Sequence, residues 1–224
     1  TSTSAPDSEQ QSEESTPMDD PVVGEPAPAA RDRRADSPVG RGGGARASRP
    51  MENSRSEPLE LDADDVAGLL WMREEEQLAH DVYIALGEHG DLRIFSRIAA
   101  SERRHVGAVV RQLDRFGIDD PMVDRPAGSF TILAIQQLYD ELVADGLESL
   151  VDALEVGASI EEMDIADLRA RATEATDVQQ LYDRLEAGSQ RHLRAFVGRL
   201  DSRGVGYEPT RLDAAEFAEI VSNG

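Results

Sequence analysis

A glutamate and a histidine stand three positions apart in the segment SERRH, at Glu102 and His105. Residues at this spacing lie side by side on one face of a helix, and here the same face also carries the apolar Ile98 and Val109. A carboxylate on an apolar face is costly to bury unless it is paired or bound to a metal ion. Carboxylate-bridged two-metal centres in helical bundles use this pairing of Glu with His at positions i and i+3.

Three more polar residues fall on the apolar stripes of other predicted helices, namely Glu76, Glu161 and His192. One shared cation-binding centre would remove the burial cost of all of them at once. Carboxylate oxygen and imidazole nitrogen together suit iron, manganese or zinc. The sequence therefore predicts a metal site to which Glu76, Glu102, His105, Glu161 and His192 contribute.

Several of these assignments have an alternative. The acidic run Glu74–Glu76 is by default a solvated face, and Glu75 can take the place of Glu76 as the ligand. A small rotation of its helix would exchange Glu162 for Glu161. His192 can also be a core histidine that is satisfied by hydrogen bonds.

The elements that must position these residues are helices. Apolar residues recur at spacings of three and four over segments 62–88, 94–116, 131–144, 147–173 and 177–202, and a weak helix follows within 205–224. No stretch shows the alternation of a strand. Four of the helices are long, and the short one at 131–144 lies in the long connection between the second and the third. This is the topology of a four-helix bundle with a crossover connection, so the predicted fold class is all-α.

The chain divides into a tail and one domain. Residues 1–58 are rich in Ser, Pro, Gly and charge without an apolar period, so we predict a disordered tail. We expect the bundle at 59–204 and a C-terminal extension with a short helix at 205–224. Aromatic residues make up only 4% of the chain, which favours a helical core of Leu, Ile, Val and Ala.

Charge and composition exclude several classes of partner and site. Residues 59–224 hold 34 acidic residues and 16 arginines, a net charge of −18, which repels nucleic acid and anionic lipid and attracts cations. The absence of Cys excludes disulfides, thiolate metal sites and Cys nucleophiles. No apolar run approaches the roughly 20 residues of a membrane helix. The tail and the first residue Thr suggest an exported or cell-surface protein, with a cytoplasmic location as the alternative.

Four segments resemble known metal proteins. EQLAHDVY, SERRH, IEEMDIADL and GSQRHLRAF resemble the four long helices of ferritins and rubrerythrins. The run from LLWMREEEQLAHDVY to GSQRHLRAF, about 66–203, is more closely similar to domain of unknown function 2202, a family of the ferritin-like superfamily. The resemblance implies a ferritin-like bundle with ligands at Glu76, Glu102, His105, Glu161 and His192. Asp164 falls where rubrerythrins carry an extra acid.

The chain departs from this pattern at Ser189, where a full ferritin-like motif has Glu. Asp164 can restore the fourth carboxylate; otherwise the second metal binds weakly or the site holds one metal. We interpret Tyr83 as a core residue, and a hydrogen bond from its hydroxyl to a ligand carboxylate is the alternative.

The resulting expectation is a non-haem metal protein with two iron ions, and with manganese or zinc as alternative metals. Its enzyme class would be a di-iron oxidoreductase that acts as a ferroxidase or uses O2 or peroxide. The alternative is a non-catalytic metal-binding or interaction bundle, tethered at the cell surface by the tail. The expected partners are metal ions and not nucleic acid, and a homo-oligomer remains open.

Overall fold

The computed structural model describes residues 61–89 and 93–222, which contain six α-helices and no strand. The helices are α1 (Ala63–His89), α2 (Arg93–Phe116), α3 (Leu133–Gly146), α4 (Leu150–Ala170), α5 (Thr176–Asp201) and α6 (Ala214–Ser222). The all-α prediction is therefore confirmed. None of the helices described is long and apolar enough to cross a membrane. The predicted disordered tail, 1–58, lies outside the described residues.

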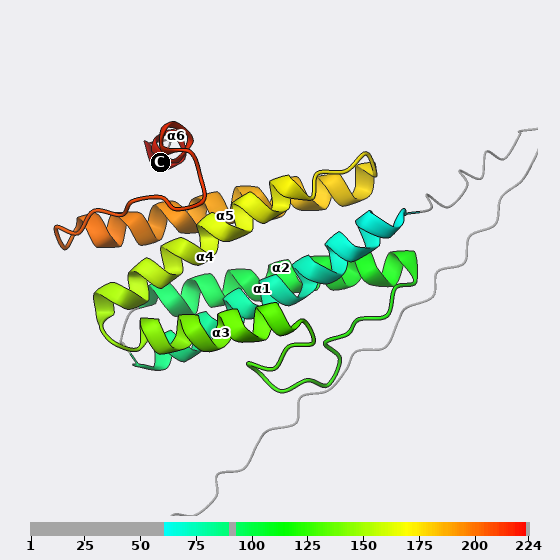
Figure 1. Cartoon of the computed structure of the whole chain (residues 1–224), viewed down its shortest axis with the longest axis horizontal. Helices are drawn as coiled ribbons and strands as arrows, with labels where there is room; N and C mark the ends of the chain where they lie inside the picture. Colours follow the sequence, from blue (N-terminus) through cyan, green and yellow to red (C-terminus); the bar gives the residue numbers. More distant parts are fainter. Residues whose placement is uncertain (1–60, 90–92, 223–224) are drawn as a thin grey trace, which may run out of the picture. The chain divides into compact units, whose positions relative to one another are not determined.

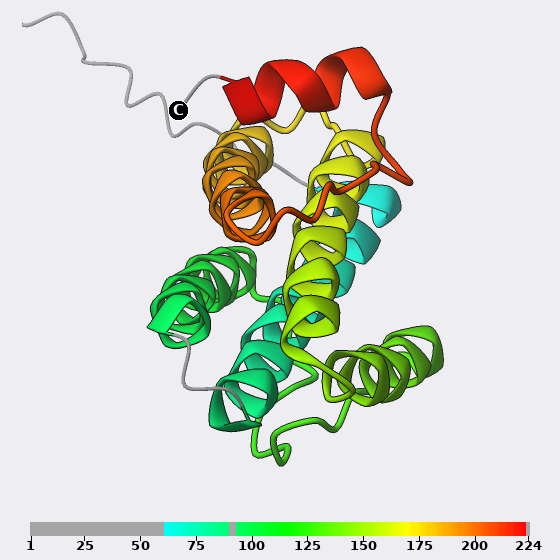
Figure 2. The same cartoon turned by 90° about the vertical axis from the view of Figure 1, so that its left-hand side faces the viewer.

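The long helices pack as two pairs. α1 packs along α2, and α4 packs along α5 (Figure 1). The pairs meet through contacts of α2 with α5 and of α1 with α4, so the four long helices surround a common interior (Figure 2). α3 packs against α1 and α4, and α6 packs against α5.

Side-chain caps set the starts of two long helices. Asp62 lies just before α1, and its carboxylate accepts hydrogen bonds from the backbone N–H groups of Asp64 and Asp65 in the first turn, at 2.9 and 2.8 Å. α4 begins at Leu150 and not at the predicted 147, because the Ser149 hydroxyl caps it. α2 ends where Gly117 turns to φ +67°, a conformation that suits glycine.

The buried apolar residues form two clusters. One contains Tyr83, Phe95 and Phe196, whose ring centroids lie 5.4 to 6.2 Å apart. The other contains Leu69, Met72, Val109, Leu113, Leu168, Val178, Leu181, Tyr182 and Leu185. On α2, Glu102 and His105 fall between Ala99 of the first cluster and Val109 of the second. Apolar packing thus flanks the predicted site at both ends.

Candidate metal centre

Five of the predicted residues form two groups of candidate metal ligands that share Glu102. Glu76 from α1 joins Glu102 and His105 from α2 in the first group, while Glu161 from α4 and His192 from α5 join Glu102 in the second. Within each group the ligand atoms lie within 4.8 Å of one another. Glu102 turns Oε2 to His105 and Oε1 to His192, so its carboxylate links the two groups.

The histidine nitrogens and the carboxylate oxygens converge closely. Nδ1 of His105 lies 2.7 Å from Oε2 of Glu102 and 3.3 Å from Oε2 of Glu76. Nδ1 of His192 lies 2.7 Å from Oε1 of Glu102 and 3.4 Å from Oε2 of Glu161. Both nitrogens are nevertheless buried without a hydrogen-bond partner among the described residues, because the contacts lack hydrogen-bond direction. Donor atoms that converge in this way surround a point where a cation could sit.

Protons balance part of the charge when no metal ion is bound. Burial alone would lower the pKa of His105, but the carboxylates of Glu102 and Glu76 raise it to about 11. Burial also opposes protonation of His192, whereas Glu161 and Glu102 raise its pKa to about 10. Burial favours the neutral form of Glu102, but the two histidines lower its pKa to about 2. Both histidines are therefore protonated at neutral pH, and a metal ion must displace these protons.

The centre contains more carboxyl groups than its two histidines can neutralise. Burial and the charge of Asp164 raise the pKa of Glu76 well above its ordinary value. Burial, followed by the charges of Glu161 and Glu102, raises the pKa of Asp164 to about 7. Burial and the charge of Glu102 also raise the pKa of Glu161. Two histidinium ions do not neutralise this many carboxylates, but divalent cations would.

Asp164 lies in neither ligand group, although it is buried beside them. Its Oδ2 accepts a hydrogen bond from the Ser189 hydroxyl of α5. Its Oδ1 is buried without a partner among the residues described. Ser189 of α5 carries no carboxylate itself, but its hydroxyl orients the carboxylate of Asp164 from α4.

Tyr83 is buried in the core, and its hydroxyl also reaches the centre. Its hydroxyl donates a hydrogen bond of 2.6 Å to Oε1 of Glu161. This bond leaves Oε2 of Glu161 free to face His192, from which it is 3.4 Å away. The tyrosine therefore fixes the orientation of this carboxylate.

The acidic run on α1 is not the solvated face that its composition suggests, because all three carboxylates are buried. Glu74 accepts hydrogen bonds from the backbone N–H groups of Thr131 and Ile132, at 2.8 and 3.0 Å, and so holds the segment before α3. Glu75 accepts a 2.6 Å hydrogen bond from Nε1 of Trp71. Glu76 alone of the three belongs to a ligand group.

Glu162 does not exchange with Glu161. Its carboxylate accepts the backbone N–H of Leu212 at 2.7 Å and the hydroxyl of Tyr207 at 2.8 Å, in the segment that leads to α6. These bonds direct it away from the ligand groups. Glu162 therefore anchors the C-terminal segment.

Gly188 of α5 is a residue that the sequence analysis did not single out. A Cβ atom at this position would lie 2.5 Å from Cε1 and 2.6 Å from Nε2 of His105. The missing side chain therefore makes the space in which the imidazole sits. The available signal was a glycine in mid-helix, one turn before His192 on the inward stripe.

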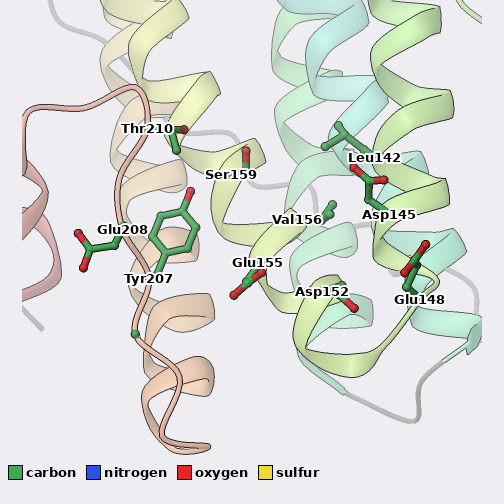
Figure 3. A pocket seen from close by; sticks show the side chains of 11 residues that line it. Leu142, Asp145, Glu148, Asp152, Glu155, Val156, Ser159, Tyr207, Glu208 and Thr210 are labelled. Atoms are coloured by element: carbon green, nitrogen blue, oxygen red, sulfur yellow. The ribbon is translucent and has the colours of Figure 1, made fainter.

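A separate hollow lies away from this centre. It has a volume of about 680 Å³ and lies between α3, α4 and residues 206–210 (Figure 3). Its lining includes five acidic residues and no basic one: Asp145, Glu148, Asp152, Glu155 and Glu208. The outer face of α3 and α4 is thus a strongly acidic part of the surface, separate from the buried carboxylates.

Comparison with known proteins finds a family and a relative that are both described as uncharacterized. Residues 65–224 match the family described as "Uncharacterized protein domain (DUF2202)". The uncharacterized protein MJ0754 of Methanocaldococcus jannaschii is 41% identical over 165 residues, which cover 73% of this chain and 89% of the relative. The crystal structure of that hypothetical protein superimposes with a TM-score of 0.72 and covers 74% of this chain and 95% of the other.

Proposed function

The chain belongs to the family of the uncharacterized protein domain DUF2202, and we propose that it is a ferritin-like metal protein. In this proposal the four long helices form the ferritin-like bundle and α3 lies in its crossover connection. The centre binds two iron ions, with manganese and zinc as the alternative metals. The activity is that of a di-iron oxidoreductase whose substrate is ferrous ion itself or a molecule oxidised with O2 or peroxide.

One observation carries the proposal, namely the buried donor atoms that lack a partner. Among the described residues these include Oε1 of Glu76, Oε1 of Glu102, Oδ1 of Asp164, Nδ1 of His105 and Nδ1 of His192. A buried polar atom without a partner costs about 1 to 3 kcal/mol, and the ion pairs of Glu102 with His105 and His192 offset only part of this cost. These five atoms come from four helices and belong to five of the six predicted ligands. Oε1 of Glu75, which lies in neither ligand group, is also buried without a partner. A metal centre would satisfy the five ligand atoms together.

The donor set also suggests how the ligands divide. Glu102 would help to hold both ions, because each of its oxygens faces one histidine. Glu76 and His105 complete one site, while Glu161 and His192 complete the other. Oxygen and imidazole donors without thiolate suit iron, manganese or zinc.

Asp164 supplies the remaining carboxylate in this proposal. The Ser189 hydroxyl already holds one of its oxygens and leaves the other without a partner. A carboxylate from α4 therefore replaces the one that α5 lacks.

When bound, the metal pair supplies one-electron redox chemistry. The chain's own residues prepare the site for it. The hydroxyl of Tyr83 keeps Glu161 oriented, and the apolar clusters on both sides limit access of water. The net charge of −18 concentrates cations near the domain.

The test mixes the metal-free full chain with ferrous ion in air and follows the absorbance of ferric ion. We expect wild type to oxidise ferrous ion faster than buffer does, and Glu102→Ala to match buffer. Glu75→Gln is the matched control, because Glu75 is equally buried one residue from Glu76 and lies in neither ligand group. It should behave as wild type does.

Equilibrium dialysis against manganous ion is run beside this assay, and we expect two ions per wild-type chain. If wild type binds no more ion than Glu102→Ala, the metal site is refuted. If wild type binds the ions but oxidises iron no faster than buffer, the oxidoreductase is refuted and a non-catalytic metal-binding bundle takes its place.

A further inference from the structure

A second pocket, of about 380 Å³, lies between α2 and α5 and has a basic lining. Its residues are Arg93, Ile94, Arg97 and Ile98 from α2 and Ala195 and Arg199 from α5. Three arginines and three apolar residues therefore line the pocket. This composition is the opposite of that of the acidic hollow between α3 and α4.

These three arginines are exposed and, like most arginines of the described residues, form no ion pair with a carboxylate; what sets them apart is that they gather in one pocket. Among the described residues, Arg73, Arg115, Arg169 and Arg171 each form an ion pair with a carboxylate. Within the same residues no carboxylate pairs with Arg93, Arg97 or Arg199, although acidic residues outnumber arginines two to one in 59–224. Like charges gathered without a counter-charge repel one another, and an anion in the pocket would remove this repulsion.

The start of α2 adds a second observation. α1, α4 and α5 carry acidic residues in the first turn, where the helix dipole favours negative charge. The first turns of α2 and α3 have none, and that of α2 begins with Arg93. A bound anion would supply negative charge at this helix start and would also accept hydrogen bonds from the guanidinium groups.

The pocket lies beside the metal centre. Ile98 precedes Glu102 by four residues on α2, and Ala195 follows His192 by three on α5, so about one helical turn separates pocket and centre on each helix. The side chains of His105 and His192 are 13% and 11% exposed, against 1 to 2% for Glu76, Glu102 and Glu161. The histidines are therefore the side of the centre that is nearest to solvent.

We propose that this α2–α5 pocket binds a phosphate-type oxyanion. The planar guanidinium groups of Arg97 and Arg199, one on each helix, hold its oxygens in bidentate fashion, and Arg93 closes the site at the start of α2. The apolar side chains of Ile94 and Ile98 accept the organic part of a phosphate ester. The site goes beyond the metal chemistry and does not depend on it.

The experiment titrates inorganic phosphate into the metal-free full chain by isothermal calorimetry at constant ionic strength. We expect saturable binding of one phosphate per chain. The double variant Arg97→Gln/Arg199→Gln should weaken it by tenfold or more. The control Arg111→Gln/Arg184→Gln removes two exposed arginines from the same helices, outside the pocket, and should bind within twofold of wild type.

Three results would overturn the assignment. They are the absence of saturable binding to wild type, equal weakening by the pocket and control variants, and competition by acetate at the same concentration as phosphate. Residues 59–224 carry a net charge of −18, which repels anions. Phosphate binding by wild type and by the control variant therefore cannot be explained by non-specific attraction. Because no metal is present, the outcome is independent of the metal-binding test.

Discussion

Gly188→Ala separates the geometry of the metal centre from the stability of the helix that carries it. The new Cβ would lie 2.5 Å from Cε1 and 2.6 Å from Nε2 of His105, whereas ordinary contacts begin near 3.4 Å. The imidazole must therefore move by roughly 1 Å, while metal–ligand distances tolerate only about 0.2 Å. The ring has room to move because it already borders solvent, so the fold should survive.

The expected result is a protein of equal or greater stability that binds less metal. Replacing Gly by Ala inside a helix stabilises it by about 0.5 to 1 kcal/mol. Gly198→Ala is the matched control on the same helix, because no atom lies within 4 Å of its added Cβ. We expect this control to raise Tm by roughly 2 to 4 °C and to leave metal binding unchanged. Gly188→Ala should retain the ion held by Glu161 and His192 and lose the one held by Glu76 and His105.

Equilibrium dialysis against manganous ion measures the stoichiometry, and circular dichroism measures folding and Tm. A double-mutant cycle with His105→Ala tests the same contact without metal. The full increase in stability from Gly188→Ala should appear only when the imidazole of His105 is absent. Two ions bound with wild-type affinity by Gly188→Ala would refute the reasoning. So would a cycle in which the two substitutions are additive.

Two further predictions concern pH and the tail. Because the metal-free folded protein holds protons on His105 and His192 up to pH of about 11 and 10, an ion must displace them at neutral pH, and its affinity should rise steadily from pH 6 to pH 9. Calorimetry in buffers of different ionisation enthalpy should detect the released protons, and an affinity that is flat over this range would contradict the pKa shifts. Removal of residues 1–58 should leave Tm unchanged, since their sequence has no core pattern, and a Tm lowered by several degrees would show that they dock on the domain.

Helical periodicity was sufficient to predict which residues form the two groups of candidate metal ligands. The i, i+3 spacing of Glu102 and His105 needs only one helix, and the apolar stripes of the other helices pointed to Glu76, Glu161 and His192. The structure brings these five side chains together. The predicted division into a tail and one bundle domain is not tested by the described residues, which begin at 61.

Periodicity failed for the acidic run on α1 because this helix has no solvated face at Glu74–Glu76. Three consecutive residues cover about 200° of a helix, and such a run normally has to meet solvent. Here α2, α3 and α4 all pack against α1. The contact with α3 depends on a connection between distant parts of the chain, which no local pattern encodes.

The partners of the buried carboxylates distinguish structural acids from candidate ligands. Glu74 and Glu162 are fully buried, but each accepts two backbone N–H bonds from a segment that starts or precedes another helix. Such bonds offset the cost of burial, so these two acids need no cation. Glu76, Glu102 and Asp164 each keep a buried oxygen without a partner, and so does Glu75, whose other oxygen accepts from Trp71. The sequence shows equal acids at all these positions. The backbone groups that face Glu74 and Glu162 mark these two as structural, and only the distances to the histidines separate Glu76 from Glu75.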